Sequence, residues 1–398
     1  GLDRADFVAN FFWYQPALNY GYAEITELWQ DPIDAPGPQK NRAELRKILA
    51  YWFDRGCDGF RVDMASSLIK NDTGKRETTK LWQDIREWMD QTYPQCILVA
   101  EWSEPSESIP AGYHLDYMMH FHAPGYPSLF FNETGTLPPK EGPCYFSDDA
   151  VGSLSIFRPE YEKQLAAVAG KGLISLPTAN HDFQRLRCGS RGWAGLPAAW
   201  VFLMTQVGSP TIYYGDEIGM RFVSETQGKE GSTFADIAAA NAGAINGERA
   251  GTRTPMQWDN SPNAGFSTAD PEQHYLPLDH DPERPSVASQ QQDPESLLNF
   301  VTKLLALRRQ HPALGSKGSF EFLNENGDDY PMVYRRELDG QSYLITVNPS
   351  AIAQSTTVAL SLKSADPILV KGAEISPMEN GRAALEVAAY GYGIFRLL

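Results

Sequence analysis

The sequence predicts an α/β fold in which parallel strands alternate with helices, followed by a separate antiparallel β domain. Two observations carry this prediction. Amphipathic helical segments alternate with short apolar segments through most of the chain, which is typical of βαβ units around a parallel sheet. From about residue 320 onward the helical pattern gives way to short β segments separated by turn residues, which indicates a β domain.

The alternation begins with two helices and two strands. Residues 40–56 place large apolar side chains on one helical face and end at a glycine. Residues 57–63 are a short apolar segment that ends in charge. Residues 77–93 form a second amphipathic helix that a proline stops, and residues 96–101 have the continuous apolar character of a buried parallel strand.

Further elements continue the pattern. We predict strands at 117–121, 173–176 and 210–217, and helices at 160–169, 196–206 and 294–309. Residues 221–293 are long, polar and irregular, which favours a functional loop region over a simple connection. The last third of the β domain contains predicted strands such as 368–370 and 394–398.

The composition narrows the range of functions. The formal net charge of −16 repels phosphate backbones, so the sequence predicts no nucleic-acid partner, whereas an uncharged sugar is indifferent to that charge. No stretch approaches the ~20 apolar residues of a membrane span, so we expect no membrane partner. The cysteines form no C-x-x-C pair, so no metal site is predicted from them.

Carboxylates follow three of the predicted strands: Asp63, Glu101 and Asp182. In barrels of parallel strands the active site lies at the carboxyl ends of the strands. Arg61 and Asp63 are two residues apart, so they share one face of their strand. Charged side chains at such positions cost free energy unless they are paired or used, and we therefore expect these residues to be functional.

Two carboxylates with different roles are what glycoside hydrolysis requires. Arg61 favours the ionised form of Asp63, which suits a nucleophile. Partial burial and neighbouring carboxylates would raise the pKa of Glu101, which suits a general acid/base. Asp182 would bind sugar hydroxyls and stabilise positive charge at the anomeric centre, with His181 as a hydrogen-bond donor.

Each residue taken alone also has a plainer interpretation. Asp63 could be an ion-pair partner of Arg61, Glu101 could mark where a strand meets solvent, and Asn180 could belong to a turn. Aromatic residues such as Trp102 and Phe183 are more often core residues than sugar platforms. The combination is what favours catalysis.

At this point the motifs resemble those of the α-amylase superfamily of retaining glycoside hydrolases. Gly59–Asp63 resembles the fourth-strand motif G-x-R-x-D, which ends in the nucleophile. Val99–Trp102 is similar to the fifth-strand motif with the acid/base, and Asn180–Asp182 to the seventh-strand motif with the stabilising aspartate. The resemblance implies catalytic roles for Asp63, Glu101 and Asp182. We expect substrate contacts from Arg61, Trp102, Asn180, His181, Phe183 and Arg185.

Another segment narrows the resemblance. Arg253–Asp259 resembles the R-T-P-M-Q-W segment of oligo-α-glucosidases and trehalose synthases. Gln15–Asn19 looks like the family's Q-P-D-L-N motif, with Ala17 in place of the acidic residue. Met64–Ser67 lacks the K-H pair of many amylases, so the family's guides to linkage preference do not transfer.

The resemblance implies a (β/α)8-type barrel represented from about its fourth strand onward, followed by a C-terminal antiparallel β-sandwich. Residues 1–36 would end an inserted subdomain or loop, residues 37–314 would be the C-terminal portion of the barrel, and residues 315–398 the all-β domain. We expect the first strands to exist in the working protein, as part of a longer chain or as a separate piece. No cofactor is required, and calcium stays open because its usual ligands lie in that missing part.

Three functions follow as alternatives. The first is hydrolysis of α-glucosidic bonds in short α-glucans or disaccharides by double displacement. The second is a transglucosylase or isomerase of the trehalose synthase type, which uses the same carboxylates and excludes water from the intermediate. The third, of another class, is a catalytically inactive accessory or binding subunit, against which the three retained carboxylates argue.

Overall fold

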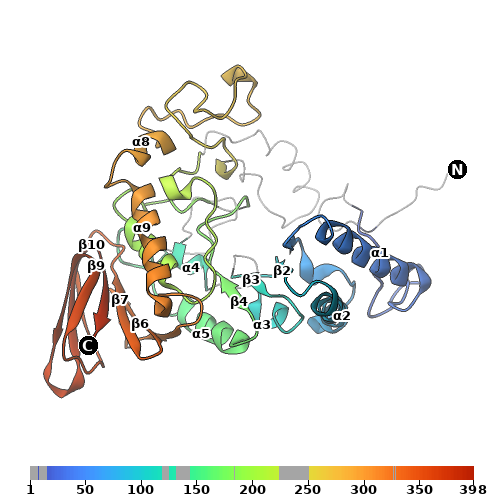
Figure 1. Cartoon of the computed structure of the whole chain (residues 1–398), viewed down its shortest axis with the longest axis horizontal. Coiled ribbons are helices and arrows are strands. Elements are labelled where there is room, and N and C mark those ends of the chain that lie inside the picture. The colour runs from blue at the N-terminus through green and yellow to red at the C-terminus, as the bar shows by residue number, and fades with distance from the viewer. Residues whose placement is uncertain are drawn as a thin grey trace. The chain divides into compact units, whose positions relative to one another are not determined.

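A computed structural model describes residues 8, 16–118, 125–130, 144–182, 184–223, 251–325, 327 and 329–398. The chain divides into two compact units (Figure 1). Unit 1 comprises residues 1–122 and 163–174, and unit 2 comprises residues 123–162 and 175–398. Within the described ranges, no helix has both the length and the hydropathy that crossing a membrane requires.

Unit 1 contains the first strands of a parallel sheet. Its elements are α1 (Pro36–Phe53), β1 (Gly59–Val62), the 3₁₀ turns η1 (Ala65–Ser67) and η2 (Thr73–Lys75), α2 (Arg76–Thr92), β2 (Ile97–Ala100), α3 (Pro105–Ser108) and β3 (Leu115–Tyr117). β1 pairs with β2 and β2 with β3, all parallel, in a sheet of order β1-β2-β3-β4 whose last strand is β4 (Leu173–Ser175). The predicted alternation of helices with parallel strands is confirmed.

The helix α2 holds the connection after β1 in place. Its apolar face, with Leu81, Trp82 and Ile85, is buried. The indole Nε1 of Trp82 donates to the carbonyl oxygen of Ala65 at 3.0 Å. Asp72, which precedes the N-cap residue Lys75, satisfies an otherwise unpaired donor of the first helical turn: its carboxylate accepts the backbone N–H of Thr78 at 2.7 Å. The segment that follows Asp63 is therefore fixed by a packed helix.

Gly59 begins β1 where two strands approach closely. A Cβ at this position would collide with the backbone carbonyl oxygen of Ile97 on β2. The register places Gly59 opposite Ile97 and Val62 opposite Ala100. The first glycine of the G-x-R-x-D motif thus has a packing reason to be glycine.

Unit 2 combines helices with an antiparallel sheet. Its helical elements are α4 (Pro127–Phe130), α6 (Leu196–Thr205), η3 (Asp216–Ile218), η6 (Pro271–Gln273), α8 (Val287–Gln291), α9 (Leu297–Gln310) and η7 (Pro312–Leu314), and α5 (Phe157–Val168) runs across the boundary between the units. Residues Ala198 to Thr205 of α6 are all buried, as expected for a helix that is apolar on every side. The predicted strand at 210–217 is wrong over most of its length: Thr211 makes a single parallel bridge to Pro177, and η3 follows.

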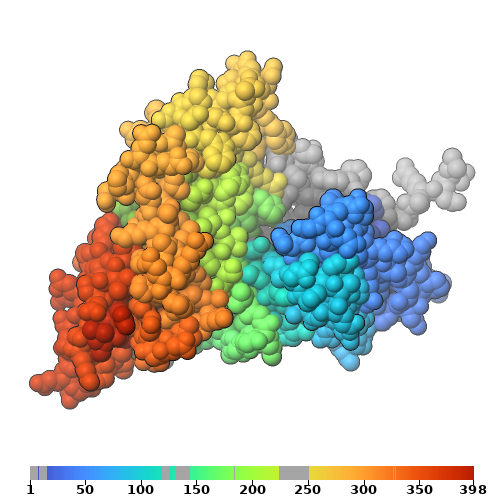
Figure 2. Space-filling view, in the orientation of Figure 1, coloured from blue at the N-terminus to red at the C-terminus, as the bar shows by residue number. Residues whose placement is uncertain are grey.

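The C-terminal sheet is antiparallel, as predicted. It contains β5 (Ser319–Phe322), β6 (Met332–Leu338), β7 (Gln341–Val347), β8 (Gln354–Val358), β9 (Ala365–Pro377) and β10 (Ala383–Leu397), and η8 (Glu379–Gly381) joins the last two strands. Its order is β5-β6-β7-β10-β8, and β9 also pairs with β10. Side chains such as Val333, Leu344 and Leu385 fill its core. In Figure 2 the sheet (red) lies beside α9 (orange), where the rings of Phe300 and Tyr392 are 5.5 Å apart.

Arg308 ties α9 to the end of α6. Its guanidinium donates to the carbonyl oxygens of Met204 at 2.9 Å, Gln206 at 2.8 Å, Gly208 at 2.6 Å and Leu314 at 2.6 Å. Met204 lies in the last turn of α6, Leu314 ends η7, and Gln206 and Gly208 follow α6. Carbonyl groups at and beyond the end of a helix lack partners within it. One cation therefore satisfies four acceptors.

We expect Arg308→Met to lower the free energy of unfolding by about 2–4 kcal/mol, because the carbonyl groups lose a charged donor. Urea unfolding followed by circular dichroism measures this change. Arg309→Met is the matched control, since the neighbouring Arg309 is exposed and should tolerate the change. Equal stability of the two variants would contradict the role given to Arg308.

Candidate active site

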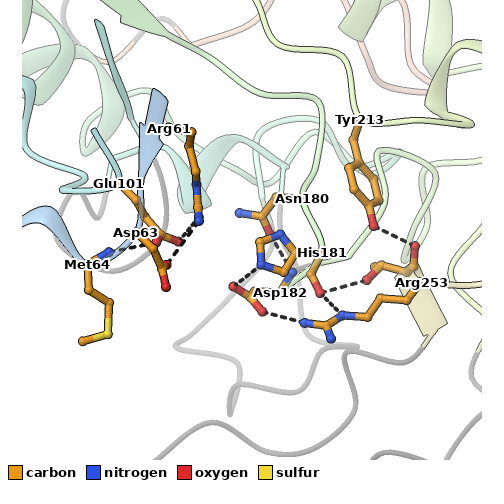
Figure 3. A network of polar contacts seen from close by, with 10 residues as sticks. Arg61, Asp63, Met64, Glu101, Asn180, His181, Asp182, Tyr213 and Arg253 are labelled. Atoms are coloured by element: carbon orange, nitrogen blue, oxygen red, sulfur yellow. Dashed lines mark hydrogen bonds and ion pairs between the residues drawn. The ribbon is translucent and has the colours of Figure 1, made fainter. Parts of the chain in front are cut away.

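Unit 1 brings three of the predicted site residues together. Arg61 lies on β1, Asp63 directly follows β1, and Glu101 directly follows β2 (Figure 3). Arg61 contacts both acids: its Nη1 is 3.1 Å from Asp63 Oδ1, and its Nη2 is 2.5 Å from Glu101 Oε1. The two carboxylates therefore share one guanidinium.

The environments of the two carboxylates differ strongly. The side chain of Asp63 is 72% exposed, whereas that of Glu101 is 11% exposed. Burial and a hydrogen bond with Asp63 raise the pKa of Glu101 to about 8, although the charge of Arg61 and the backbone N–H of Met64 oppose the shift. Its surroundings thus favour the protonated form of Glu101, next to the exposed carboxylate of Asp63. A proton donor beside a carboxylate nucleophile is the arrangement that acid-assisted substitution requires.

A buried aspartate that the sequence analysis did not single out supports the loop after Glu101. Asp116 on β3 accepts the backbone N–H groups of Trp102 at 3.2 Å, Ser103 at 3.3 Å and Glu104 at 3.1 Å. The hydroxyl of Ser108 also donates to it at 2.7 Å. Burial raises the pKa of Asp116 to about 7 against the effect of these donors. The turn that begins at Glu101 is therefore built around this one side chain.

Trp102 belongs to the core of unit 1. It is 2% exposed, and its indole Nε1 donates to Glu107 Oε2 at 2.9 Å. Its ring packs against Tyr113 with the centroids 6.4 Å apart. In this arrangement its face is covered, so the plainer interpretation as a core residue fits Trp102 better than a direct contact with a sugar.

Unit 2 holds the second group of predicted residues. The Asn180 side-chain oxygen accepts the backbone N–H of Asp182 at 2.8 Å. His181 Nε2 lies 3.2 Å from Asp182 Oδ2, and Arg253 Nη2 lies 3.0 Å from Asp182 Oδ1 (Figure 3). Arg253 Nε also donates to the His181 carbonyl oxygen at 2.8 Å. Phe183, another predicted contact, lies outside the described residues.

A buried carboxylate supports this group as well. Asp216 Oδ2 accepts the hydroxyl of Thr178 at 2.6 Å, and Thr178 in turn accepts the backbone N–H of Tyr213 at 2.9 Å. Asp216 is fully buried, and burial raises its pKa to about 6. The segment that leads to Asp182 is thereby fixed to the chain near Tyr213.

Arg185 is also a supporting residue. It is completely buried, with Nη1 3.4 Å from Asp216 Oδ1. It donates to the carbonyl oxygens of Tyr214 at 2.5 Å and Thr252 at 2.9 Å, and its guanidinium lies over the Tyr213 and Tyr214 rings. All of these partners are protein groups, so a direct substrate contact, which we expected of Arg185, does not fit its position.

Sequence reasoning did not find three of these supporting residues. Arg253 lies in the segment that resembles R-T-P-M-Q-W, but no pattern indicated that it pairs with Asp182. Asp116 falls just before the predicted strand 117–121, and Asp216 is the next-to-last residue of the predicted strand 210–217, but neither position indicated a supporting role. Within the described ranges, no group of three or more His, Cys, Asp or Glu side chains is arranged to hold a metal ion.

The fold and the strand-end motifs define a glycoside hydrolase family. A model of the α-amylase catalytic domain matches residues 35–317, and the chain belongs to this family. The resemblance inferred from the motifs is confirmed.

Among curated relatives, trehalose synthase of Thermus thermophilus is 27% identical, and the match covers 99% of this chain and 40% of the relative. Oligo-1,6-glucosidase of Parageobacillus thermoglucosidasius is 26% identical, with coverages of 84% and 61%. The chain thus spans 40% to 61% of the length of these two relatives. A trehalulose synthase structure from Pseudomonas mesoacidophila MX-45 has a TM-score of 0.70 at 23% identity and covers 90% of this chain and 69% of its own, which shows the shared fold.

We expect Asp116→Asn to lower the free energy of unfolding by about 1–3 kcal/mol, because an amide nitrogen would face donors that now bond to a carboxylate oxygen. Urea unfolding at pH 8 measures the loss. The deficit should grow as the pH falls below 7, because the wild-type protein gains stability when Asp116 takes up a proton and the asparagine variant cannot. An Asp116 carboxyl that is protonated in the fold stabilises it at low pH, and this contribution is lost as the pH rises from 3.8 towards about 7. Glu87→Gln, which changes an exposed carboxylate on α2, is the control for a generic loss of charge.

Proposed function

We propose that this protein is a retaining glycoside hydrolase that acts on α-glucosidic bonds of short α-glucans or disaccharides. The observation that carries the proposal is the pair of Asp63 and Glu101 on one Arg61 guanidinium, with the pKa of Glu101 raised to about 8. Retaining enzymes use a close pair of carboxyl groups, one ionised and one protonated. The family match and the names of the relatives supply the substrate class.

In the proposed mechanism Asp63 attacks the anomeric carbon while Glu101 donates its proton to the leaving oxygen. The glycosidic bond breaks and a glucosyl ester forms on Asp63. Glu101, now ionised, takes a proton from water, which attacks the anomeric carbon and releases Asp63 and glucose. Asp182 from unit 2 would complete the site by binding sugar hydroxyls as positive charge develops. Its proximity to the other two acids is part of the proposal.

A second candidate is transfer of the glucosyl group to another sugar hydroxyl instead of water. Several relatives carry the name trehalose synthase, and these match the chain as well as the oligo-1,6-glucosidases do. Incubation with maltose separates the two functions, since hydrolysis yields glucose and isomerisation yields trehalose. Isomaltose, sucrose, trehalose and starch complete a panel that tests linkage and chain length.

We expect Asp63→Asn, Glu101→Gln and Asp182→Asn each to lower kcat on maltose by about 10²–10⁴-fold. The Glu101→Gln loss should be much smaller on 4-nitrophenyl α-glucoside, because nitrophenolate leaves without a proton. Initial rates of glucose or nitrophenol release measure both effects. Asp58→Asn is the matched control, since Asp58 is an exposed carboxylate just before β1. Near-normal turnover by any of the three variants would remove that residue from the mechanism.

The pH dependence gives an independent test of Glu101. The protonated form is the active acid, so kcat/KM should fall as the pH rises through about 8. Arg61→Met removes a charge that lowers the pKa of Glu101, so the basic limb should move to higher pH even though the rate falls. Initial rates between pH 5 and 10 measure the limb. A limb that stays in place would assign it to another group.

A further inference from the structure

Met64, the residue that follows Asp63, has an unusual backbone conformation. Its φ is +46° and its ψ is 41°, which places it in the left-handed helical region. This region costs free energy for residues other than glycine, and asparagine or aspartate, which relieve part of that cost, does not occupy the position. A residue that persists in such a conformation is held there by the structure around it, and this occurs often at functional sites.

The chain is held on both sides of Met64. On one side, the pairing of β1 with β2 extends as far as the Glu101 backbone N–H, which donates to the Val62 carbonyl oxygen at 3.0 Å. On the other side, the Met64 carbonyl oxygen accepts the backbone N–H and the hydroxyl of Ser67, both at 3.0 Å, and Ala65 is completely buried. Met64 therefore makes the change of direction between the end of β1 and the turn η1.

This change of direction places the Met64 backbone N–H against the side chain of Glu101 (Figure 3). The N–H donates to Glu101 Oε2 at 3.2 Å, while Arg61 Nη2 lies 2.5 Å from Glu101 Oε1. Within the described residues, the charged groups that act on Glu101 are Arg61 and Asp63, which belong to the same segment as Met64. A backbone N–H neither titrates nor changes rotamer. Because the peptide plane is rigid, the direction of this N–H follows from the backbone torsions, and φ of Met64 is one of them.

We propose that Met64 is a positioning residue, whose left-handed backbone aims its N–H at Oε2 of Glu101 and holds the carboxyl group in the orientation for proton transfer. The inference rests on the proposed function, since Glu101 transfers a proton only in that mechanism. A hydrogen bond from an N–H group stabilises the ionised carboxylate, so it lowers the pKa that burial raises. The Met64 N–H thus favours the form of Glu101 that takes a proton from water in the second step.

Met64→Val and Met64→Asn separate this role from a general effect of losing the methionine side chain. Valine is branched at Cβ and disfavours the left-handed region, whereas asparagine, which is of similar size, tolerates it. Met64→Val should turn the N–H away from Glu101. It should move the basic limb of kcat/KM up by about one pH unit and lower kcat on maltose about tenfold, with little change in KM. Met64→Asn should keep the limb near its original position and lose much less of the rate.

The matched control is Lys75, another left-handed residue of unit 1, at φ +56° before the first turn of α2. Lys75→Val and Lys75→Asn make the same change of backbone preference at a position outside the candidate site. Lys75→Val should lower the urea midpoint of unfolding, as Met64→Val does, but the two Lys75 variants should have the same basic limb. If Met64→Val is too unstable to assay, Met64→Thr repeats the comparison, because threonine is also branched at Cβ.

A ¹³C NMR titration of the Glu101 carboxyl group, assigned with Glu101→Gln, reads the pKa of Glu101 without turnover. This pKa should rise in Met64→Val and stay in place in Met64→Asn. An unchanged pKa in Met64→Val, an equal shift in Lys75→Val, or a shifted pKa with unaltered kcat would overturn the proposal. A wild-type protein that releases no product from any sugar of the panel would refute the proposed function instead, and the titration would still show whether the Met64 N–H acts on Glu101.

Discussion

The parallel pairing of β1 with β2 determines where the charges of unit 1 lie. Val62 is paired with Ala100, so the next residue of each strand leaves the sheet at the same edge. Those residues are Asp63 and Glu101. Arg61, one residue before Val62, then reaches both carboxylates. A register shift of one residue would send these side chains to the opposite face and leave the buried glutamate without its cation.

Both units use a buried aspartate to shape a loop that carries a candidate catalytic acid. Asp116 gathers the backbone N–H groups that follow Glu101, and Asp216 fixes Thr178 ahead of Asp182. Burial raises the pKa of each, to about 7 and about 6. Such carboxylates resist removal, because their donors would be left unsatisfied in the interior. In the proposed mechanism Glu101 and Asp182 act on the substrate, and the buried Asp116 and Asp216 hold the loops that carry them in position.

The described part of the long loop region, residues 251–286, forms one side of a pocket. Residues 251–286 are fixed by ion pairs and turns, and their aromatic side chains face a pocket instead of the core. Arg253 lies in this loop region, and its guanidinium forms an ion pair with Asp182.

The sequence by itself determined the strand–helix alternation, the antiparallel C-terminal sheet, and the positions of Asp63 and Glu101 directly after β1 and β2. These are local properties, set by periodicity and by short motifs. Asp182, which we also expected at a strand end, lies in the chain beyond the end of β4 at Ser175. The sequence could not show that Trp102 and Arg185 are buried, that Arg253 pairs with Asp182, or that Asp116 organises the turn after Glu101. Those facts depend on contacts between residues far apart in the chain, and spacing along one sequence carries no information about them. Tertiary packing alone decides which polar residues face a cavity and which are enclosed by protein donors.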